Sequence, residues 1–77
     1  MEEYIFTFGS GQDLEGYFVR IKGKDYFDCR RIMFEKFGEE WAFEYPLEKW
    51  NEWVEKAKTL HIPVEKELLC IENEQIK

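Results

Sequence analysis

The 77 residues carry a net charge of −6 and have the size of one small acidic domain. A chain of this length buries only about 60% of the surface that its unfolded form exposes, so it needs dense packing or association of subunits. The 17 acidic residues against 11 basic ones argue against a partner held through the phosphates of duplex DNA. Aromatic residues, 18% of the chain, supply a core or a subunit interface. We expect a single domain over residues 1–77 that forms a homo-oligomer.

The cysteines and the apolar runs indicate a cytoplasmic protein. Cys29 and Cys70 fit no metal or redox spacing, so both are expected to be reduced thiols. No hydrophobic leader precedes Tyr4, and the longest apolar runs are a few residues, against about 20 for a membrane span. We therefore expect no membrane contact, no metal ion and no cofactor.

Period-two alternation predicts two strands that form a hairpin. Residues 3–8 are rich in aromatic and β-branched types, and residues 17–21 repeat this chemistry with alternating apolar positions. The connection over residues 9–16 contains three glycines in eight residues. Such a segment suits a backbone that bends sharply or approaches a ligand closely.

The next segment carries the signals of a helix over residues 26–37. Asp25 is the predicted N-cap, and Gly38 stands where a left-handed residue ends a helix. Arg30 falls near the middle of the stripe that is expected to pack on the sheet. That stripe comprises Tyr26, Phe27, Met33, Phe34 and Phe37. A guanidinium in this place needs a carboxylate, carbonyl groups or an anionic ligand to offset its desolvation.

The second half of the chain predicts a strand, a helix and a tail. Residues 40–45 alternate as a strand, Pro46 suits the first turn of a helix, and the apolar spacing continues to His61. Residues 67–71 are read as a short strand, with a last helical turn as the alternative, and residues 72–77 as a frayed tail. The fold class is α+β, of order ββαβα with a C-terminal strand as a further element. The sheet is expected to be antiparallel and packed by the first helix.

The candidate binding residues gather around Arg30. Either this side chain passes Phe34 to pair with an acidic residue such as Glu44, or it lies at the floor of a cleft and contacts a phosphate or a carboxylate. The turn at residues 9–12 suits an anion, and aromatic walls suit a stacked base, although turns and core aromatics are also common structural features. The predicted ligand-binding set is Arg30, Gln12, Gly9, Ser10, Gly11, Tyr17, Trp41 and Tyr45.

Neither the histidine nor the cysteines form a catalytic pattern, and the second helix carries an acidic face. His61 has no second histidine at metal or general-base spacing, and Cys29 has no histidine partner, so we expect a helix-end cap and a packed thiol rather than a catalytic pair. The chain is thus predicted not to be an enzyme. The second helix carries Glu48, Glu52 and Glu55, which form either a solvated face or a surface that imitates a phosphate backbone to a basic groove.

Three motifs resemble a group of very small proteins that bacteriophages and prophages encode, especially those of Gram-positive hosts. The motifs are FTFGSGQ at residues 6–12, RRIMFE at residues 30–35 and WAFEY at residues 41–45, in the order and spacing of that group. They span a little over half of the chain. Pro46 departs from the polar N-cap of the group, and the last third of the chain matches none of its motifs.

The resemblance implies a phage accessory protein that acts in the host bacterial cytoplasm against host immunity. The leading expectation is a protein that sequesters a signalling nucleotide, with Arg30 on the phosphate, residues 9–12 around it, and Tyr17 or Trp41 stacked on the base. The alternative is an inhibitor of the anti-CRISPR type, in which the acids of the second helix block the basic nucleic-acid groove of a host defence nuclease.

Overall fold

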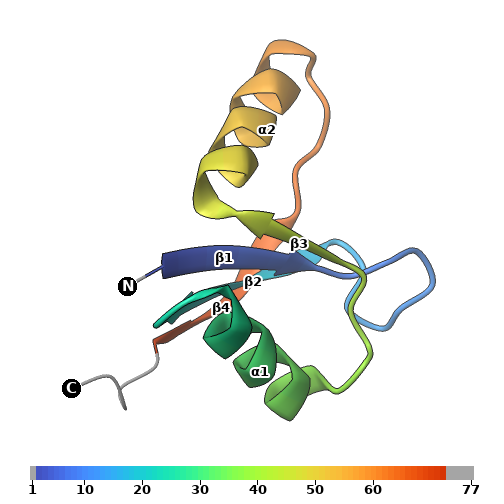
Figure 1. Cartoon of the computed structure of the whole chain (residues 1–77). Coiled ribbons are helices and arrows are strands. Elements are labelled where there is room, and N and C mark those ends of the chain that lie inside the picture. The colour runs from blue at the N-terminus through green and yellow to red at the C-terminus, as the bar shows by residue number, and fades with distance from the viewer. Residues whose placement is uncertain (1, 73–77) are drawn as a thin grey trace.

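The computed structural model describes residues 2–72, which form a four-stranded sheet with one helix on each face (Figure 1). The elements in chain order are β1 (Glu2–Thr7), β2 (Tyr17–Gly23), α1 (Tyr26–Phe37), β3 (Phe43–Pro46), α2 (Leu47–Thr59) and β4 (Lys66–Glu72). The predicted α+β class and element order are confirmed, and the C-terminal segment is a strand. The predicted frayed tail starts one residue too early, at the last residue of β4, and its residues 73–77 lie outside the described part of the chain.

The sheet has the strand order β3-β1-β2-β4. β1 is antiparallel to both β2 and β3, as the sequence predicts for its first three strands. β4 runs parallel to β2 and makes the sheet mixed. Residues 47–65 carry the chain from the β3 edge to the opposite edge, so that it enters β4 in the direction of β2; a parallel pair requires a crossover of this kind.

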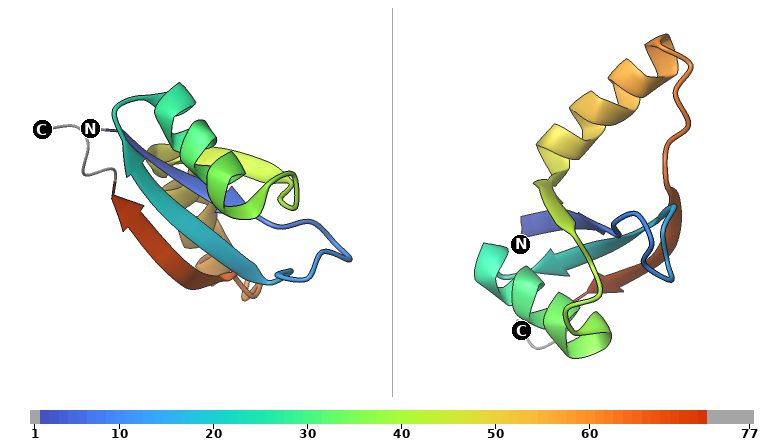
Figure 2. Two further views of the ribbon diagram at one scale, coloured as in Figure 1. Left: turned by 90° about the horizontal axis from the view of Figure 1, so that it is seen from below. Right: turned by 90° about the vertical axis from the view of Figure 1, so that its right-hand side faces the viewer.

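The helices lie on opposite faces of the sheet, as the two views in Figure 2 show. Alternation along β1 directs Phe6 to the α1 face and Ile5 to the α2 face, and both side chains are fully buried. The α1 face holds the larger cluster, formed by Phe6, Phe8, Val19, Ile21, Cys29, Ile32 and Met33. The α2 face holds Ile5, Phe18 and Trp50. Two thin cores therefore share one sheet.

Helix α1 has the predicted bounds but a different buried face. The Asp25 side chain accepts a hydrogen bond from the Asp28 N–H at 2.8 Å, and Gly38 has a φ of 61°. The buried positions are Cys29, Ile32 and Met33, whereas Phe27, predicted to face the sheet, is 75% exposed. The helix packs on the sheet through Cys29, whose thiol lies 3.6 Å from the Ile21 carbonyl, and Phe27, two residues earlier, points to another side of the helix.

Strand β3 and helix α2 differ from the prediction at their ends. β3 begins at Phe43 rather than at residue 40, because the chain turns after α1, where the Glu40 N–H donates to the Phe37 carbonyl at 3.1 Å. Pro46 precedes α2 as its N-cap without a capping side chain, instead of lying in the first turn. His61 follows the helix with a φ of 57°, near the end as expected. Within residues 2–72 neither helix is long and apolar enough to cross a membrane.

We expect Asp25→Ala to lower the free energy of unfolding by about 1 kcal/mol, because the Asp28 N–H loses its acceptor. Chemical denaturation followed by circular dichroism measures this change. Asp25→Asn keeps a side-chain oxygen at the cap and serves as the control, with most of the stability retained. Equal stability of the alanine variant and the parent would contradict the assigned cap.

Candidate functional site

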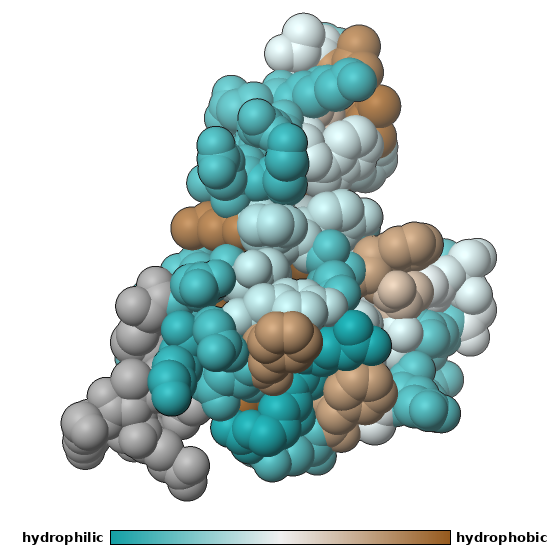
Figure 3. All heavy atoms as spheres, viewed as in Figure 1, coloured by the Kyte–Doolittle hydropathy of each residue, from teal (hydrophilic) through white to brown (hydrophobic). Residues whose placement is uncertain are grey.

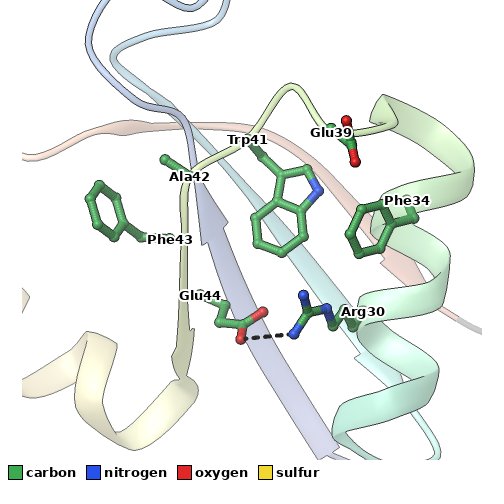
Figure 4. A pocket seen from close by; sticks show the side chains of 7 residues that line it. All are labelled: Arg30, Phe34, Glu39, Trp41, Ala42, Phe43 and Glu44. Carbon is green, nitrogen blue, oxygen red and sulfur yellow. Dashed lines mark ion pairs between the residues drawn. The ribbon is translucent and has the colours of Figure 1, made fainter.

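An open pocket of about 510 Å³ lies between α1 and the segment that leads into β3 (Figure 4). The helix contributes one wall, and the chain that leaves the helix returns along the edge of the sheet as the other. The Ala42 N–H donates to the Thr7 carbonyl at 2.9 Å and fixes this second wall beside β1. The lining residues are Arg30, Phe34, Glu39, Trp41, Ala42, Phe43 and Glu44.

Arg30 is the cation of this pocket, and its guanidinium is held on one side only. Its Nη1 donates to the Tyr26 hydroxyl at 2.9 Å and lies 3.7 Å from Glu44 Oε1. Its carbon Cζ lies 5.4 Å from the ring centroid of Phe34 and 5.8 Å from that of Trp41, within the range of cation–π attraction. The Nε and Nη2 groups have no hydrogen-bond partner within residues 2–72.

Glu44 faces Arg30 from the start of β3. Its Oε1 accepts a hydrogen bond from the Tyr26 hydroxyl, while its Oε2 is buried and has no hydrogen-bond partner in the described part of the chain. Leaving a buried acceptor unpaired costs about 1–3 kcal/mol, so such an atom calls for an explanation. Glu39 is exposed at the rim. The ionisable groups of the pocket, one arginine and two glutamates, sum to −1.

Trp41 belongs to the core and to the pocket at once. Its ring packs edge-to-face on Phe6, with centroids 5.1 Å apart, and on Phe34, with centroids 5.4 Å apart. Its Nε1 donates to the Gly38 carbonyl at 3.0 Å. These contacts fix the indole, and Figure 4 shows it beside Phe34 and the Arg30 guanidinium, whereas the ring of Phe43 points away from them.

The other two aromatic residues of the predicted set do not line this pocket. Tyr45 packs on Trp50 with a centroid distance of 5.8 Å, on the α2 face of the sheet. Tyr17 stands at the start of β2 and is 40% exposed. The predicted wall of Tyr17, Trp41 and Tyr45 is therefore not assembled. The sequence predicts alternation over residues 40–45, but the strand begins only at Phe43, and Trp41 and Tyr45 pack on opposite faces of the sheet.

Two backbone N–H groups of the turn at residues 9–12 are hydrogen-bonded to nearby side chains. The Gly9 N–H donates to Gln12 Oε1 at 2.5 Å, and the Gly11 N–H donates to Glu15 Oε1 at 3.3 Å. Ser10 is exposed, and none of the four residues lines the pocket. Gly9 has a steric role instead, since a Cβ there would lie 3.1 Å from the Ala42 Cβ. It allows the pocket wall to pack closely on β1.

The sequence did not indicate the roles of Tyr26, which lies beside the pocket, and of Glu39, which lies at its rim. Tyr26 was assigned to the packing stripe, but its hydroxyl joins Arg30 to Glu44. The spacing of Tyr26, Arg30 and Phe34, each four residues from the next, places them along one side of a helix and was the available signal. Glu39 lies in an irregular segment, where no periodicity indicates which way a side chain points.

The acidic residues of α2 are exposed and interleaved with lysines. Glu52 lies 3.6 Å from the Lys49 Nζ, and Glu55 lies 3.8 Å from the Lys58 Nζ. Glu48 is exposed in the first turn. Paired charges of both signs present a weaker negative surface than the carboxylates alone, so this face fits the solvated alternative better than an imitation of a phosphate backbone.

The two cysteines differ in their surroundings. Cys29 is fully buried, and burial raises the pKa of its thiol to about 11, with the Asp28 carboxylate contributing in the same direction. Cys70 is exposed on β4. In residues 2–72 no three histidine, cysteine or acidic side chains gather in an arrangement that could hold a metal ion.

Comparison with protein-family models, with curated proteins and with solved structures gave no match. The resemblance to small phage proteins therefore stays a prediction.

We expect a thiol reagent at neutral pH to modify Cys70 quickly and Cys29 slowly, because Cys29 is buried and remains neutral. A colorimetric thiol assay measures both phases, and both thiols should react quickly in denaturant. Cys70→Ser should remove the fast phase alone. Two fast phases in the native protein would contradict the buried position of Cys29.

Proposed function

We propose that this protein is a non-catalytic nucleotide-binding protein that holds its ligand in the pocket beside Arg30. The proposal rests on the hydrogen bonding of the Arg30 guanidinium, which is held on one side and unpartnered on the other. Tyr26, Glu44 and two aromatic rings hold it in place through Nη1 and its face, while Nε and Nη2 stay unpartnered in the part of the chain that the structure describes. An immobilised guanidinium has already lost the side-chain entropy that ligand binding would otherwise cost.

The unpartnered groups have the geometry of an anion site. Nε and Nη2 form one edge of the planar guanidinium and present two parallel N–H donors, the arrangement that makes bidentate contacts with phosphate or carboxylate oxygens. Trp41 and Phe34 stand beside this edge, and stacking of a base on an aromatic ring contributes about 1–3 kcal/mol. In Figure 3 the apolar residues on the viewed face form separate groups among hydrophilic ones, which suits a small ligand better than an extended apolar partner.

The charge of the pocket narrows the class of nucleotide. Glu39 and Glu44 outnumber Arg30, so a triphosphate would bring three or more negative charges to a site that is already negative. A phosphodiester carries one charge per phosphate and meets less repulsion. The exposed part of the Glu44 carboxylate would accept a hydrogen bond from a base amino group. A cyclic nucleotide or dinucleotide fits these conditions best.

The biological role follows from the resemblance to phage proteins. A protein that binds a nucleotide without turnover lowers its free concentration, and in an infected cell this would silence an immune response that the nucleotide activates. The protonated state of the buried Cys29 thiol supports a binding protein rather than a nucleophilic enzyme. We propose that the protein sequesters a host immune signalling nucleotide in this way.

We expect a cyclic mononucleotide or dinucleotide to bind in isothermal titration calorimetry, and the corresponding triphosphate to bind more weakly. Arg30→Ala should weaken binding by about 1.5–3 kcal/mol, or roughly 10- to 150-fold in Kd, because a charge-assisted contact is lost. Arg30 is partly exposed, so this change should cost less than about 1 kcal/mol of stability. Circular dichroism checks the fold.

The neighbouring arginine provides the matched control. Arg31 pairs with Asp28 and Glu35 on the outer side of α1, away from the pocket, and Arg31→Ala should leave the affinity unchanged. Two results would refute the proposal: absence of binding across adenine, guanine and pyrimidine phosphodiesters, or equal loss of affinity in the Arg30 and Arg31 variants.

Charge reversal on the acidic face of α2 distinguishes the nucleotide-binding proposal from the alternative of a protein inhibitor. Reversing Glu48, Glu52 and Glu55 to lysine should leave nucleotide affinity within about twofold, since none of them lines the pocket. If the protein instead blocks a basic groove, the same triple variant should lose inhibition of a purified defence nuclease, and wild-type inhibition should weaken with salt. Inhibition by the parent that the triple variant lacks would favour the alternative.

A further inference from the structure

Glu44 places a carboxylate on the apolar α1 face of the sheet. In the register of β1 and β3 it stands directly opposite Phe6, which is fully buried on that face. Residues directly opposite each other in an antiparallel pair point to the same side, so the Glu44 side chain extends toward α1. Within residues 2–72 its Oε1 accepts a hydrogen bond from the Tyr26 hydroxyl, and its Oε2 accepts none. The carboxylate therefore depends on one phenol for its hydrogen bonding.

The Tyr26 hydroxyl lies between Glu44 and Arg30. It donates to Glu44 Oε1 and accepts from Arg30 Nη1 at 2.9 Å. Arg30 Nη1 and Glu44 Oε1, joined by the dashed line in Figure 4, are 3.7 Å apart. This distance exceeds the range of an N–H···O hydrogen bond, about 2.7–3.2 Å. An arginine and a carboxylate that meet directly form a shorter and often bidentate pair. The phenol thus stands where a direct hydrogen bond would otherwise form.

Tyr26 is held in place from outside the pocket. It is the first residue of α1, directly after the Asp25 N-cap, and its ring packs edge-to-face on Tyr4 of β1 with centroids 5.3 Å apart. The spacing of four residues sets Tyr26 and Arg30 on one side of the helix. Tyr26 does not line the pocket itself. Its hydroxyl can therefore act on the pocket only through Arg30 and Glu44.

We propose that the Tyr26 hydroxyl is a spacer that keeps Glu44 from competing with the ligand for Arg30. This role rests on the proposed nucleotide-binding function. Without the hydroxyl, Glu44 would lose its hydrogen-bond donor, and the Arg30 guanidinium, 3.7 Å away, would replace it. An unpaired acceptor that is partly buried is unfavourable, so the guanidinium would move onto the carboxylate. A guanidinium in direct contact with a carboxylate attracts a phosphate less, because the carboxylate offsets its charge and repels the anion.

Crystal structures of the ligand-free parent and of Tyr26→Phe test the spacer directly. Phenylalanine keeps the ring and its contact with Tyr4 and removes only the oxygen. We expect the distance between the guanidinium nitrogens of Arg30 and the carboxylate oxygens of Glu44 to shorten from 3.7 Å to about 2.8 Å in the variant. An unchanged distance, with or without a water molecule in place of the hydroxyl, would overturn the proposal.

Isothermal titration calorimetry with 3′,5′-cyclic mononucleotides and cyclic dinucleotides of adenine and guanine tests the competition. For each compound that binds the parent, Tyr26→Phe should raise Kd about 2- to 13-fold, the effect of one hydrogen bond. Glu44→Gln removes the competing charge and keeps an acceptor oxygen. Adding Tyr26→Phe to that variant should therefore change Kd by less than about twofold. Tyr4→Phe is the matched control, since it removes a hydroxyl that bonds to Glu2, and it should leave the affinity unchanged.

The two measurements distinguish failure of the spacer from failure of the proposed function. If the parent binds and Tyr26→Phe binds equally well, Glu44 does not compete for Arg30. If Tyr26→Phe costs the same affinity in the parent and in Glu44→Gln, Tyr26 does not act through Glu44. Either result overturns the spacer and leaves nucleotide binding intact. Absence of binding to the parent overturns the nucleotide function and with it the competition, while a shortened distance in the ligand-free variant would still show that the hydroxyl separates the ion pair.

Discussion

The inner strand β1 has to be apolar on both faces, because both helices pack on it. Ile5 and Phe6 are adjacent in sequence, fully buried and directed to opposite sides of the sheet. Phe6 anchors the cluster under α1, and Ile5 anchors the smaller cluster under α2. Because strand side chains alternate, a substitution at Ile5 acts first on the core under α2, and one at Phe6 acts first on the core under α1. A domain of this size divides its limited apolar surface between two cores.

The candidate pocket depends on the same strand. The wall that carries Trp41 is held to β1 through the Thr7 carbonyl, and Gly9 leaves room for it, since a Cβ at Gly9 would lie only 3.1 Å from the Ala42 Cβ. Trp41 also packs on Phe6, so the aromatic wall is an extension of the α1-side core. Arg30 differs in this respect, since its contacts lie at the surface of the core. The fold therefore fixes the shape of the pocket, while Arg30 supplies its positive charge from an exposed position on α1.

Local signals allowed parts of the fold to be predicted, and features that depend on distant pairing were missed. The bounds of α1 follow from Asp25 and Gly38, which act within one turn of the helix. The parallel pairing of β4 depends on where residues 47–65 carry the chain, and neither segment encodes it alone. The exposure of Phe27 shows that a hydrophobic stripe gives a helix face only approximately. Cys29 is buried instead, and Phe27, two residues earlier, lies on another side of the helix.

In the candidate site, too, features that depend on local sequence were predicted, and features that depend on distant contacts were missed. The pattern of one helix predicted that Arg30 either pairs with an acidic residue or binds an anionic ligand. Glu44, the acidic residue that this prediction named, lies beside Arg30. The position of Tyr45 was not predictable, because the face of the sheet on which its side chain lies depends on where β3 begins. That point is set by a turn bond to Phe37 and a contact with Thr7. Strand alternation gives the orientation of side chains only once the first residue of the strand is known.

The two ion pairs of Arg20 form at different stages of folding. Its Nε donates to Glu67 at 2.9 Å and its Nη1 pairs with Glu3, so that one side chain joins β1, β2 and β4. Glu3 is available as soon as the first hairpin is synthesised, but Glu67 follows 47 residues after Arg20. Contacts so distant in sequence form late, because a long loop must close first. On the ribosome β2 therefore waits with one open edge until β4 emerges, and this interval is when the nascent chain is most exposed to pairing with a wrong partner.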